Sequence, residues 1–257
     1  MWVFAHHAPA AATRLPGAVD ACQSSNMAFR QTQDAVVRRA HEDPEAVEVV
    51  LYHDVLCAWS YLADARLSYL RDEYGSSVRW RYRGYPLRPE HELPDRKERA
   101  VLARHFRRVA KEREGQGVVP DLWTGRDPPT SSLPPLIALE AALPEGVAAQ
   151  RELLRALRDA AFLRGINVTR RDVILEMADQ AGLDLQRFIS RFDDPRTAAE
   201  VNDGVEEAEA LGIRGAPALV IGDEWLMQGC RDLSEYRQVI DKYLLERASA
   251  PQLRMIH

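Results

Sequence analysis

The sequence predicts an α/β protein in which a block of helices interrupts a small mixed sheet. Two observations predict the sheet: a strand–helix–strand pattern over residues 47–84, and a hairpin followed by a helix over residues 218–247. Between them, apolar residues recur at helical spacing. We therefore expect one α/β domain built from residues 47–86 and 205–249, with an all-helical insertion domain over residues 87–204.

The first half of the sheet is expected from two short segments. Val47–His53 is rich in β-branched residues and predicts a buried strand, and Val78–Gly84 alternates aromatic residues with arginines, which predicts a second strand. Apolar residues at helical spacing predict a helix over Tyr61–Tyr74, which Gly75 ends. A strand–helix–strand unit favours two parallel strands joined by a right-handed crossover.

The middle of the chain is expected to be helical. Thr169, three residues before Asp172, resembles a capping box, and Gly182 is a plausible helix end. The predicted helices cover residues 96–114, 134–142, 145–163, 169–181, 185–192 and 197–211.

The last strands are expected to form a hairpin that turns at Gly222-Asp223, and a helix over residues 232–247 follows it. If the turn is Gly222-Asp223-Glu224, Ala216 lies opposite Cys230 and Pro217 lies opposite Gly229. Residues 1–46 are expected to be a flexible extension and residues 250–257 a tail. Residues 1 to about 30 show no periodicity and are expected to be dispensable for folding.

The composition excludes several classes of protein. The chain has 257 residues, 34 Lys plus Arg against 39 Asp plus Glu, a formal charge of −5 and no block of one sign, so nucleic acid is not an expected partner. No apolar run reaches the length of about 18 residues that a membrane helix needs. The N-terminus lacks the basic region of a signal peptide, and Met27 is an alternative start.

The three cysteines, Cys22, Cys57 and Cys230, are widely spaced and odd in number, which favours a reducing compartment and a cytoplasmic location. The histidines lack the spacing of metal ligands, so no metal site and no tightly bound cofactor are expected.

The segment Asp54-Val-Leu-Cys57-Ala-Trp-Ser60-Tyr61 carries the chemistry that we expect. It resembles a Cys-x-x-Cys redox motif in which Ser60 replaces the second cysteine. Cys57 follows a strand and precedes a helix, where backbone N–H groups and the helix dipole stabilise a thiolate, so its pKa is expected below about 8.5. The alternative is a small buried cysteine without reactivity.

Pro217, in the segment Gly215-Ala-Pro-Ala, precedes a predicted strand. The Cys57 segment after the first strand and this proline before a later strand together resemble the thioredoxin fold, which implies a cis peptide bond at Pro217 that faces Cys57. The alternative is an ordinary trans proline at a strand start.

Together these segments resemble the DsbA family, in the branch with a helical insertion that includes FrnE-like proteins, 2-hydroxychromene-2-carboxylate isomerases and kappa-class glutathione transferases. Further matching segments are Arg83–Pro89, Leu154–Asn167, Ala178–Asp184 and Gly212–Ile221. The resemblance spans about residues 47 to 245 and implies a thioredoxin-like fold.

The departures from the family pattern limit what the resemblance implies. Dithiol members have Cys-Pro-Trp-Cys, of which this sequence keeps Cys57 and Trp59, whereas the transferases and isomerases resemble Ser-Pro-Tyr, with serine at the position of Cys57. The chain retains the attacking sulfur and lacks the resolving one, so the intramolecular dithiol cycle is unavailable to it.

The resemblance also implies a set of site residues. Cys57 and Ser60 would be catalytic, while Trp59, Ala216, Pro217 and, with the least support, Asn167 would bind substrate or glutathione. Cys230 is either an auxiliary thiol or a small buried residue. The arginines at 79, 81 and 83 either bind an anionic substrate or form a solvated sheet edge.

Three functions follow from the resemblance. The first is a thiol-disulfide oxidoreductase with one active-site cysteine, whose mixed disulfide an external thiol such as glutathione resolves. The second is a glutathione-dependent isomerase or transferase, and the third is a non-catalytic peptide-binding or chaperone-like protein. The expected partners are a thiol- or disulfide-bearing protein or glutathione as co-substrate, and the oligomeric state, a homodimer included, stays open.

Overall fold

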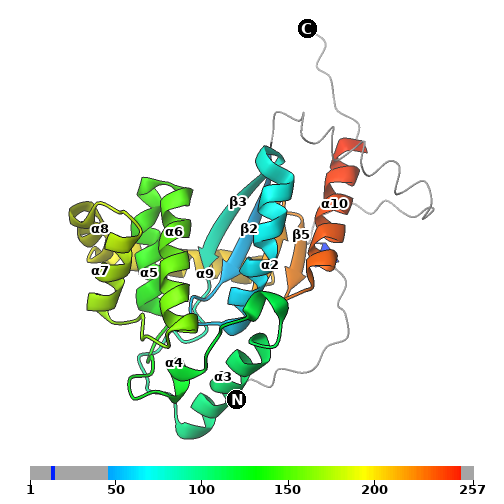
Figure 1. The fold of residues 1–257 in the computed structure, drawn as a ribbon. Helices are drawn as coiled ribbons and strands as arrows, with labels where there is room; N and C mark the ends of the chain where they lie inside the picture. The colour runs from blue at the N-terminus through cyan, green and yellow to red at the C-terminus, as the bar shows by residue number, and fades with distance from the viewer. Residues whose placement is uncertain (1–12, 15–45, 250–257) are drawn as a thin grey trace.

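The computed structural model describes residues 13–14 and 46–249, and its centre is a five-stranded sheet with the order β1-β5-β4-β2-β3 (Figure 1). β2 and β3 run parallel, whereas β4 runs antiparallel to both β2 and β5. The sheet is therefore mixed, as the sequence predicts. The strands are β1 (Thr13–Arg14), β2 (Val47–His53), β3 (Val78–Gly84), β4 (Ala218–Ile221) and β5 (Trp225–Gln228).

Helices cover both faces of this sheet. α2 (Ala58–Tyr74) connects β2 to β3 and lies with α10 (Leu233–Ser249) on one face, while α9 (Pro195–Ala210) lies on the other (Figure 1). Alternate residues of β2 point to opposite faces, so Leu51 joins the core beneath α2 and Tyr52 joins the smaller core beneath α9. Both faces of β2 are buried, which explains its nearly continuous apolar sequence.

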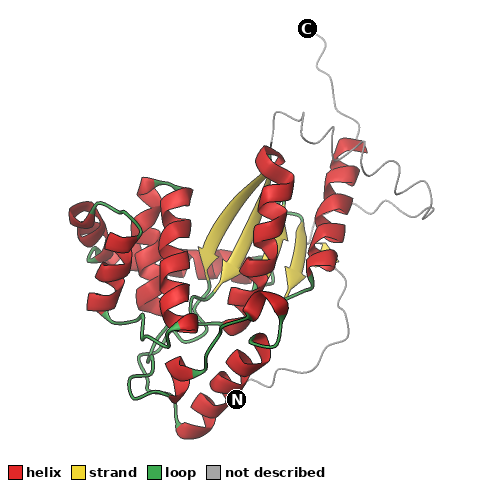
Figure 2. Cartoon of the chain, viewed as in Figure 1, coloured by secondary structure: helices red, strands yellow, loops and turns green. Residues whose placement is uncertain are grey.

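Between β3 and β4 the described chain contains helices and turns but no strand (Figure 2). α9 packs against both the helical part and the sheet, so the expected boundary between residues 204 and 205 falls inside one continuous helix. The remaining helices are α3 (Arg96–Val109), α4 (Asp121–Thr124), α5 (Leu133–Ala142), α6 (Val147–Arg158), α7 (Arg171–Gln180) and α8 (Leu185–Phe192). Single turns occur at η1 (Gly75–Ser77), η2 (Arg113–Gly115), η3 (Leu143–Glu145) and the π-helical η4 (Asp159–Leu163).

The helix ends differ from the predictions where local capping differs. α2 begins at Ala58, one turn earlier than expected, because Cys57 already accepts a helical hydrogen bond from the N–H of Tyr61. The predicted capping box at Thr169 is wrong, since α7 begins at Arg171 and the Thr169 hydroxyl donates to Asn167.

The hairpin has the predicted turn and register. Ile221 pairs with Trp225, so the loop is Gly222-Asp223-Glu224, and the N–H of Glu224 donates to the carbonyl of Ile221 at 3.2 Å. Gly222 and Asp223, the two central residues of this β-turn, both have a left-handed φ of 58°. Ala218 pairs with Gln228, and the N–H of Gly229 donates to the carbonyl of Pro217 at 2.8 Å. The predicted pairing is confirmed at these positions.

The N-terminal extension was expected to be flexible, but two of its residues form a strand. Thr13 and Arg14 form β1, which pairs antiparallel with Trp225 and Leu226 of β5, so these two residues belong to the sheet edge. The other predictions for residues 1–45, including those about Met27 and Cys22, and the expected tail over residues 250–257, fall outside the described residues.

Candidate active site around Cys57

Cys57 is the N-cap residue of α2, at the point where the chain turns from β2 into that helix. Its backbone is extended (φ −84°, ψ 117°), and its N–H donates to the carbonyl of Asp54 at 3.3 Å. The side chain is partly buried. The thiol therefore lies at the positive end of a helix, with some access from solvent.

The loop before β4 covers the sulfur. Cys57 Sγ lies 3.7 Å from the carbonyl oxygen of Ala216, to which the thiol donates a hydrogen bond. The peptide bond between Ala216 and Pro217 is cis, and both residues are buried. The structure thus brings together the two segments that the sequence singled out as Cys57 and Pro217.

Ser60 occupies the position of the second cysteine in a dithiol motif and is fully buried. Its hydroxyl oxygen accepts a hydrogen bond from the N–H of Asp54 at 3.4 Å. Hydrogen bonding from the Ser60 hydroxyl and N–H, and from the N–H of Trp59, lowers the pKa of the Cys57 thiol. Ser60 therefore orders the turn and faces the sulfur, but it cannot form a disulfide.

The expected low pKa of Cys57 is wrong in this structure. Burial is the largest influence and raises the pKa of the thiol, and the nearby carboxyl group of Asp54 raises it further. The donors at the helix start act in the opposite direction but do not outweigh burial. The raised pKa favours the protonated thiol, the form that donates to the carbonyl of Ala216.

Asp54 ties the Cys57 turn to the loop that follows β3. Its carboxylate oxygens accept hydrogen bonds from the N–H groups of Leu56 and Leu87, both at 2.7 Å, and burial raises the pKa of the carboxyl group while these bonds and one from Ser132 lower it. Sequence reasoning included Asp54 in the motif but assigned it no role. Its position directly after a buried strand is the sequence feature that could have indicated one.

Aromatic side chains pack the helical part against the start of α2. The rings of Tyr61 and Phe162 stack with centroids 4.6 Å apart, and Phe162 stacks in turn on Phe106 at 4.6 Å. The ring of Trp59 lies 6.2 Å from that of His105 in α3. Sequence reasoning set His105 aside because it lacks a metal partner, and only the packing of α3 brings it to the site.

Cys230 follows β5 and lies at the same end of the sheet as Cys57. Burial raises the pKa of the Cys230 thiol to about 12, although the guanidinium of Arg66, with Nη1 3.6 Å from the sulfur, acts against this. A negative charge on Cys57 would raise the pKa of Cys230 further. Both cysteines are free thiols.

Two other predicted candidates have partners of their own. The Asn167 side-chain amide donates to Asp127 and its oxygen accepts from Thr169, so its polar groups are used within the helical part. The side chains of the arginine stripe point to the α9 face of β3, where Arg79 and Arg81 approach Glu48 at 3.9 Å and Arg83 approaches Glu207 at 3.5 Å.

A buried ionic cluster, which sequence reasoning missed, joins α6 to the sheet domain. The Arg158 guanidinium binds the carboxylate of Asp64 in α2 and lies 3.4 Å from the ring of His53. Asp64 also binds Arg71 at 2.9 Å and accepts from the hydroxyl of Tyr82. Burial alone would raise the pKa of Asp64, but Arg158 and Arg71 hold it below its usual value.

The same cluster keeps His53 neutral. Burial, reinforced by the charge of Arg158, lowers the pKa of His53 to about 3. No local sequence pattern signals this cluster, because its members come from β2, α2, β3 and α6.

Within the part of the chain that the structure describes, no group of three or more His, Cys, Asp or Glu side chains is arranged to hold a metal ion. Among the same residues, no helix has the length and apolar character needed to cross a membrane.

The model of one protein family, the DSBA-like thioredoxin domain, matches residues 48–241. The chain belongs to this family. The match includes Cys57, the cis-proline segment and the helices between β3 and β4.

Solved structures share this DsbA-like fold at low sequence identity. An inferred protein disulfide isomerase from Nitrosomonas europaea superposes with a TM-score of 0.72 at 18% identity, covering 79% of this chain and 99% of that one. The cytosolic disulfide reductase DsbM from Pseudomonas aeruginosa gives 0.59 at 22% identity, covering 79% and 97%. A 2-hydroxychromene-2-carboxylate isomerase gives 0.58 at 19%, covering 80% and 100%.

Among curated proteins, the chain is similar to the ClpXP adapter protein SpxH from Halalkalibacterium halodurans. The two are 28% identical over 178 residues, which is 68% of this chain. The matched segment spans 58% of the relative's length.

Proposed function

We propose that this DsbA-family protein is a thiol-disulfide oxidoreductase that works through the single active-site thiol of Cys57. The observation that carries the proposal is the position of the Cys57 sulfur, at the start of α2 and 3.7 Å from the carbonyl that precedes the cis-proline. A substrate that displaces the Ala216 hydrogen bond removes the thiol's own acceptor and leaves the N–H donors of Trp59 and Ser60 to stabilise the thiolate.

In the proposed reaction, the Cys57 thiolate attacks one sulfur of a substrate disulfide. A new S–S bond forms between Cys57 and that sulfur, the original S–S bond breaks, and the other sulfur leaves as a thiolate that takes up a proton. Because Ser60 has no sulfur, the thiolate of an external thiol such as glutathione attacks the substrate sulfur of the mixed disulfide. A new S–S bond joins that thiol to the substrate, the bond to Cys57 breaks, and Cys57 leaves as a thiolate. A solved structure of DsbM with GSH supports glutathione as this co-substrate.

Two further parts of the proposal concern location and the second cysteine. A reducing, cytoplasmic location is consistent with the free thiols of Cys57 and Cys230 and with the cytosolic description of DsbM. Cys230 is proposed as an auxiliary thiol, because the β4–β5 pairing sets it beside the loop that covers Cys57.

A brief exposure to oxidised glutathione, followed by mass spectrometry of the tryptic peptides, tests the proposal. The expected result is a glutathione adduct at Cys57, lost in the Cys57→Ser variant. Modification confined to Cys22 or Cys230, with Cys57 untouched, would remove the proposed nucleophile.

Two other functions have specific support. The raised pKa of the partly buried Cys57 thiol favours a non-catalytic binding protein, and the similar SpxH proteins are named ClpXP adapters. The fold shared with a 2-hydroxychromene-2-carboxylate isomerase supports a glutathione-dependent isomerase or transferase. If the Cys57→Ser variant still captures partner proteins, the adapter is favoured over the oxidoreductase. If the protein binds glutathione tightly but reduces no disulfide, the isomerase or transferase is favoured over the oxidoreductase.

A further inference from the structure

α3 presents an unusual concentration of positive charge. Between Arg96 and Lys111 the sequence contains seven Arg or Lys residues and one Glu, in a chain whose formal charge is −5. The helix buries Ala103, Phe106 and Val109 against the rest of the protein. Its opposite side carries a basic stripe, which we define as Lys97, Val101, Arg104 and Arg108, all of them exposed.

Within the described chain, the cations of the basic stripe lack the acidic partners that several other surface arginines have. Lys97, Arg104 and Arg108 form no side-chain hydrogen bond or ion pair with another residue of the described chain. Elsewhere, Arg155 binds Glu152 and Asp159, and Arg237 binds Glu73. The unpaired stripe therefore has its positive charge available to a partner.

The basic stripe borders the candidate active site. His105, which adjoins Arg104 on α3, has its ring 6.2 Å from that of Trp59, and Trp59 is two residues from Cys57. The charges of Arg108 and Arg104, added to burial, lower the pKa of His105, so both guanidinium groups act on this part of the site. Val101, 42% exposed, adds an apolar contact in the middle of the stripe.

The length of the stripe indicates what it fits. Lys97 and Arg108 are eleven residues apart in the sequence, so the stripe extends about 16 Å along the helix axis. An extended tripeptide such as glutathione spans only about 10 Å, whereas about five extended residues span the whole stripe.

We infer that the basic stripe of α3 binds an acidic polypeptide segment next to the reactive cysteine of a protein substrate. The inference rests on the proposed function for its kinetic consequence, since the stripe would concentrate acidic disulfide substrates at Cys57. It gives the site a preference that neither Cys57 nor the cis-proline supplies.

Symmetric disulfides of three short peptides test the inference. The peptides share one cysteine and differ in a five-residue flank of Asp and Glu, of Ser and Gln, or of Lys. The rate of Cys57 adduct formation is measured by quenching and mass spectrometry. The acidic peptide is expected to react at least about tenfold faster than the neutral one at low ionic strength, and the ratio should collapse in high salt.

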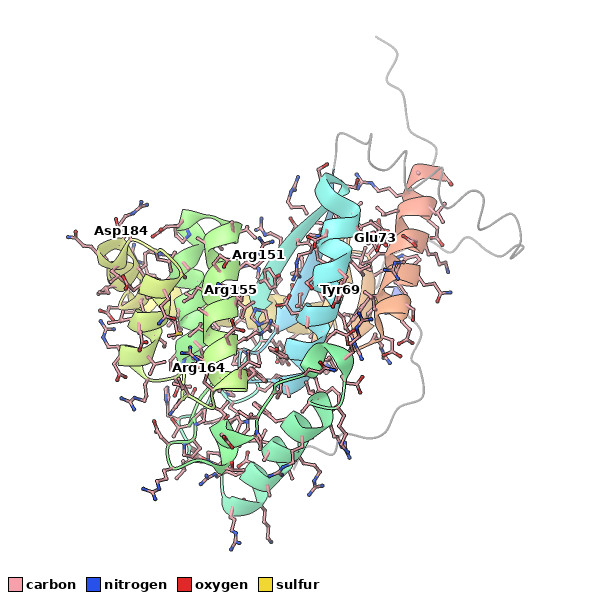
Figure 3. The ribbon with its side chains drawn as sticks, viewed as in Figure 1. Tyr69, Glu73, Arg151, Arg155, Arg164 and Asp184 are labelled. Carbon is pink, nitrogen blue, oxygen red and sulfur yellow. The ribbon has the colours of Figure 1, made fainter. Side chains whose placement is uncertain are left out.

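The variant Arg104→Glu/Arg108→Glu is expected to abolish this ratio, and Arg104→Gln/Arg108→Gln to reduce it. Arg151→Glu/Arg187→Glu makes the same change in charge on α6 and α8 and is expected to retain the ratio. Figure 3 shows Arg151 toward the end of α6 that lies away from α3. A wild-type ratio near one, or an equal loss in both glutamate variants, would overturn the inference.

A binding arm separates this inference from the proposed function. Fluorescence anisotropy measures the binding of the reduced peptides to the Cys57→Ser protein, in which no disulfide exchange at Cys57 can occur. If the acidic peptide binds more tightly and this affinity depends on Arg104 and Arg108, the inference is supported even if no peptide forms an adduct. Adducts that form without charge preference would leave the proposed function standing and reject the stripe. Tighter binding of a single-stranded oligonucleotide, or equal inhibition by free glutathione, would also reject it.

Discussion

The Cys57 thiol donates a hydrogen bond to the carbonyl of Ala216, a residue 159 positions further along the chain. This contact joins the start of α2 to the cis-proline loop. The carbonyl of Ala216 is therefore the group that a substrate would displace in the reaction that we propose for Cys57.

Ser60→Cys should convert the site from trapping to release. In the wild type, an oxidised substrate is expected to remain on Cys57 until an external thiol arrives, because Ser60 cannot attack the mixed disulfide. A cysteine one turn along α2 supplies the missing thiol, so the adduct should disappear and dithiol oxidoreductase activity should rise. Insulin reduction and non-reducing mass spectrometry measure the two effects. A Ser60→Ala control should still trap substrate. If this control released substrate, the missing thiol at position 60 would not be the cause of the trapping.

The alkylation of Cys57 should have a high pH midpoint. Burial raises the pKa of this thiol, so the thiolate should form only above the value of about 8.5 of a free cysteine. The measurement is the iodoacetamide rate against pH in protein whose Cys22 and Cys230 are replaced by serine, with the urea-unfolded chain as the reference. A folded-state midpoint below that of the unfolded chain would show that the helix N-terminus dominates after all.

Cys230→Ser should lengthen the lifetime of a Cys57 mixed disulfide if Cys230 acts as the auxiliary thiol. Arg66 lies 3.6 Å from the Cys230 sulfur and lowers its pKa against burial, so Arg66→Gln should have the same effect in weaker form. Time-resolved mass spectrometry after removal of free glutathione gives the lifetimes. Unchanged lifetimes in both variants would assign resolution wholly to external thiols.

Arg158→Met should destabilise the protein by about 3 kcal/mol, because it leaves the buried side of Asp64 without its main counter-charge. The free energy of unfolding in urea measures this. Arg155→Met, whose ion pairs are on the surface of the same helix, should change stability by no more than about 0.5 kcal/mol. The double variant Arg158→Met/Asp64→Leu should recover part of this loss in stability, because it also removes the unpaired carboxylate. If Arg158→Met cost no more stability than Arg155→Met, the buried cluster would not be stabilising.

The sequence was sufficient for the order and pairing of the main elements. Val47–His53 and Val78–Gly84 form parallel strands, and the hairpin turns at Gly222-Asp223 with the predicted register. These features depend on periodicity and turn chemistry, which operate over a few neighbouring residues and are therefore visible in the sequence.

The same local reasoning was incomplete at the helix ends and in the N-terminal extension. Thr169 resembles a cap in sequence, yet its hydroxyl bonds to Asn167, and β1 attaches Thr13 and Arg14 to an edge strand more than 200 residues away. A cap and an edge pairing each compete with alternatives of nearly equal energy, so the surrounding structure decides between them.

The sequence by itself determined that Cys57 lies between a strand and a helix, that Ser60 replaces a second sulfur, and that Pro217 precedes a strand. Only the tertiary structure decided the protonation of Cys57, the closure by Ala216, the pairing of Arg158 with Asp64 and the approach of α3 to Trp59. Burial and long-range charge set these properties, and both depend on which distant segments pack together, a quantity that no local window of sequence contains.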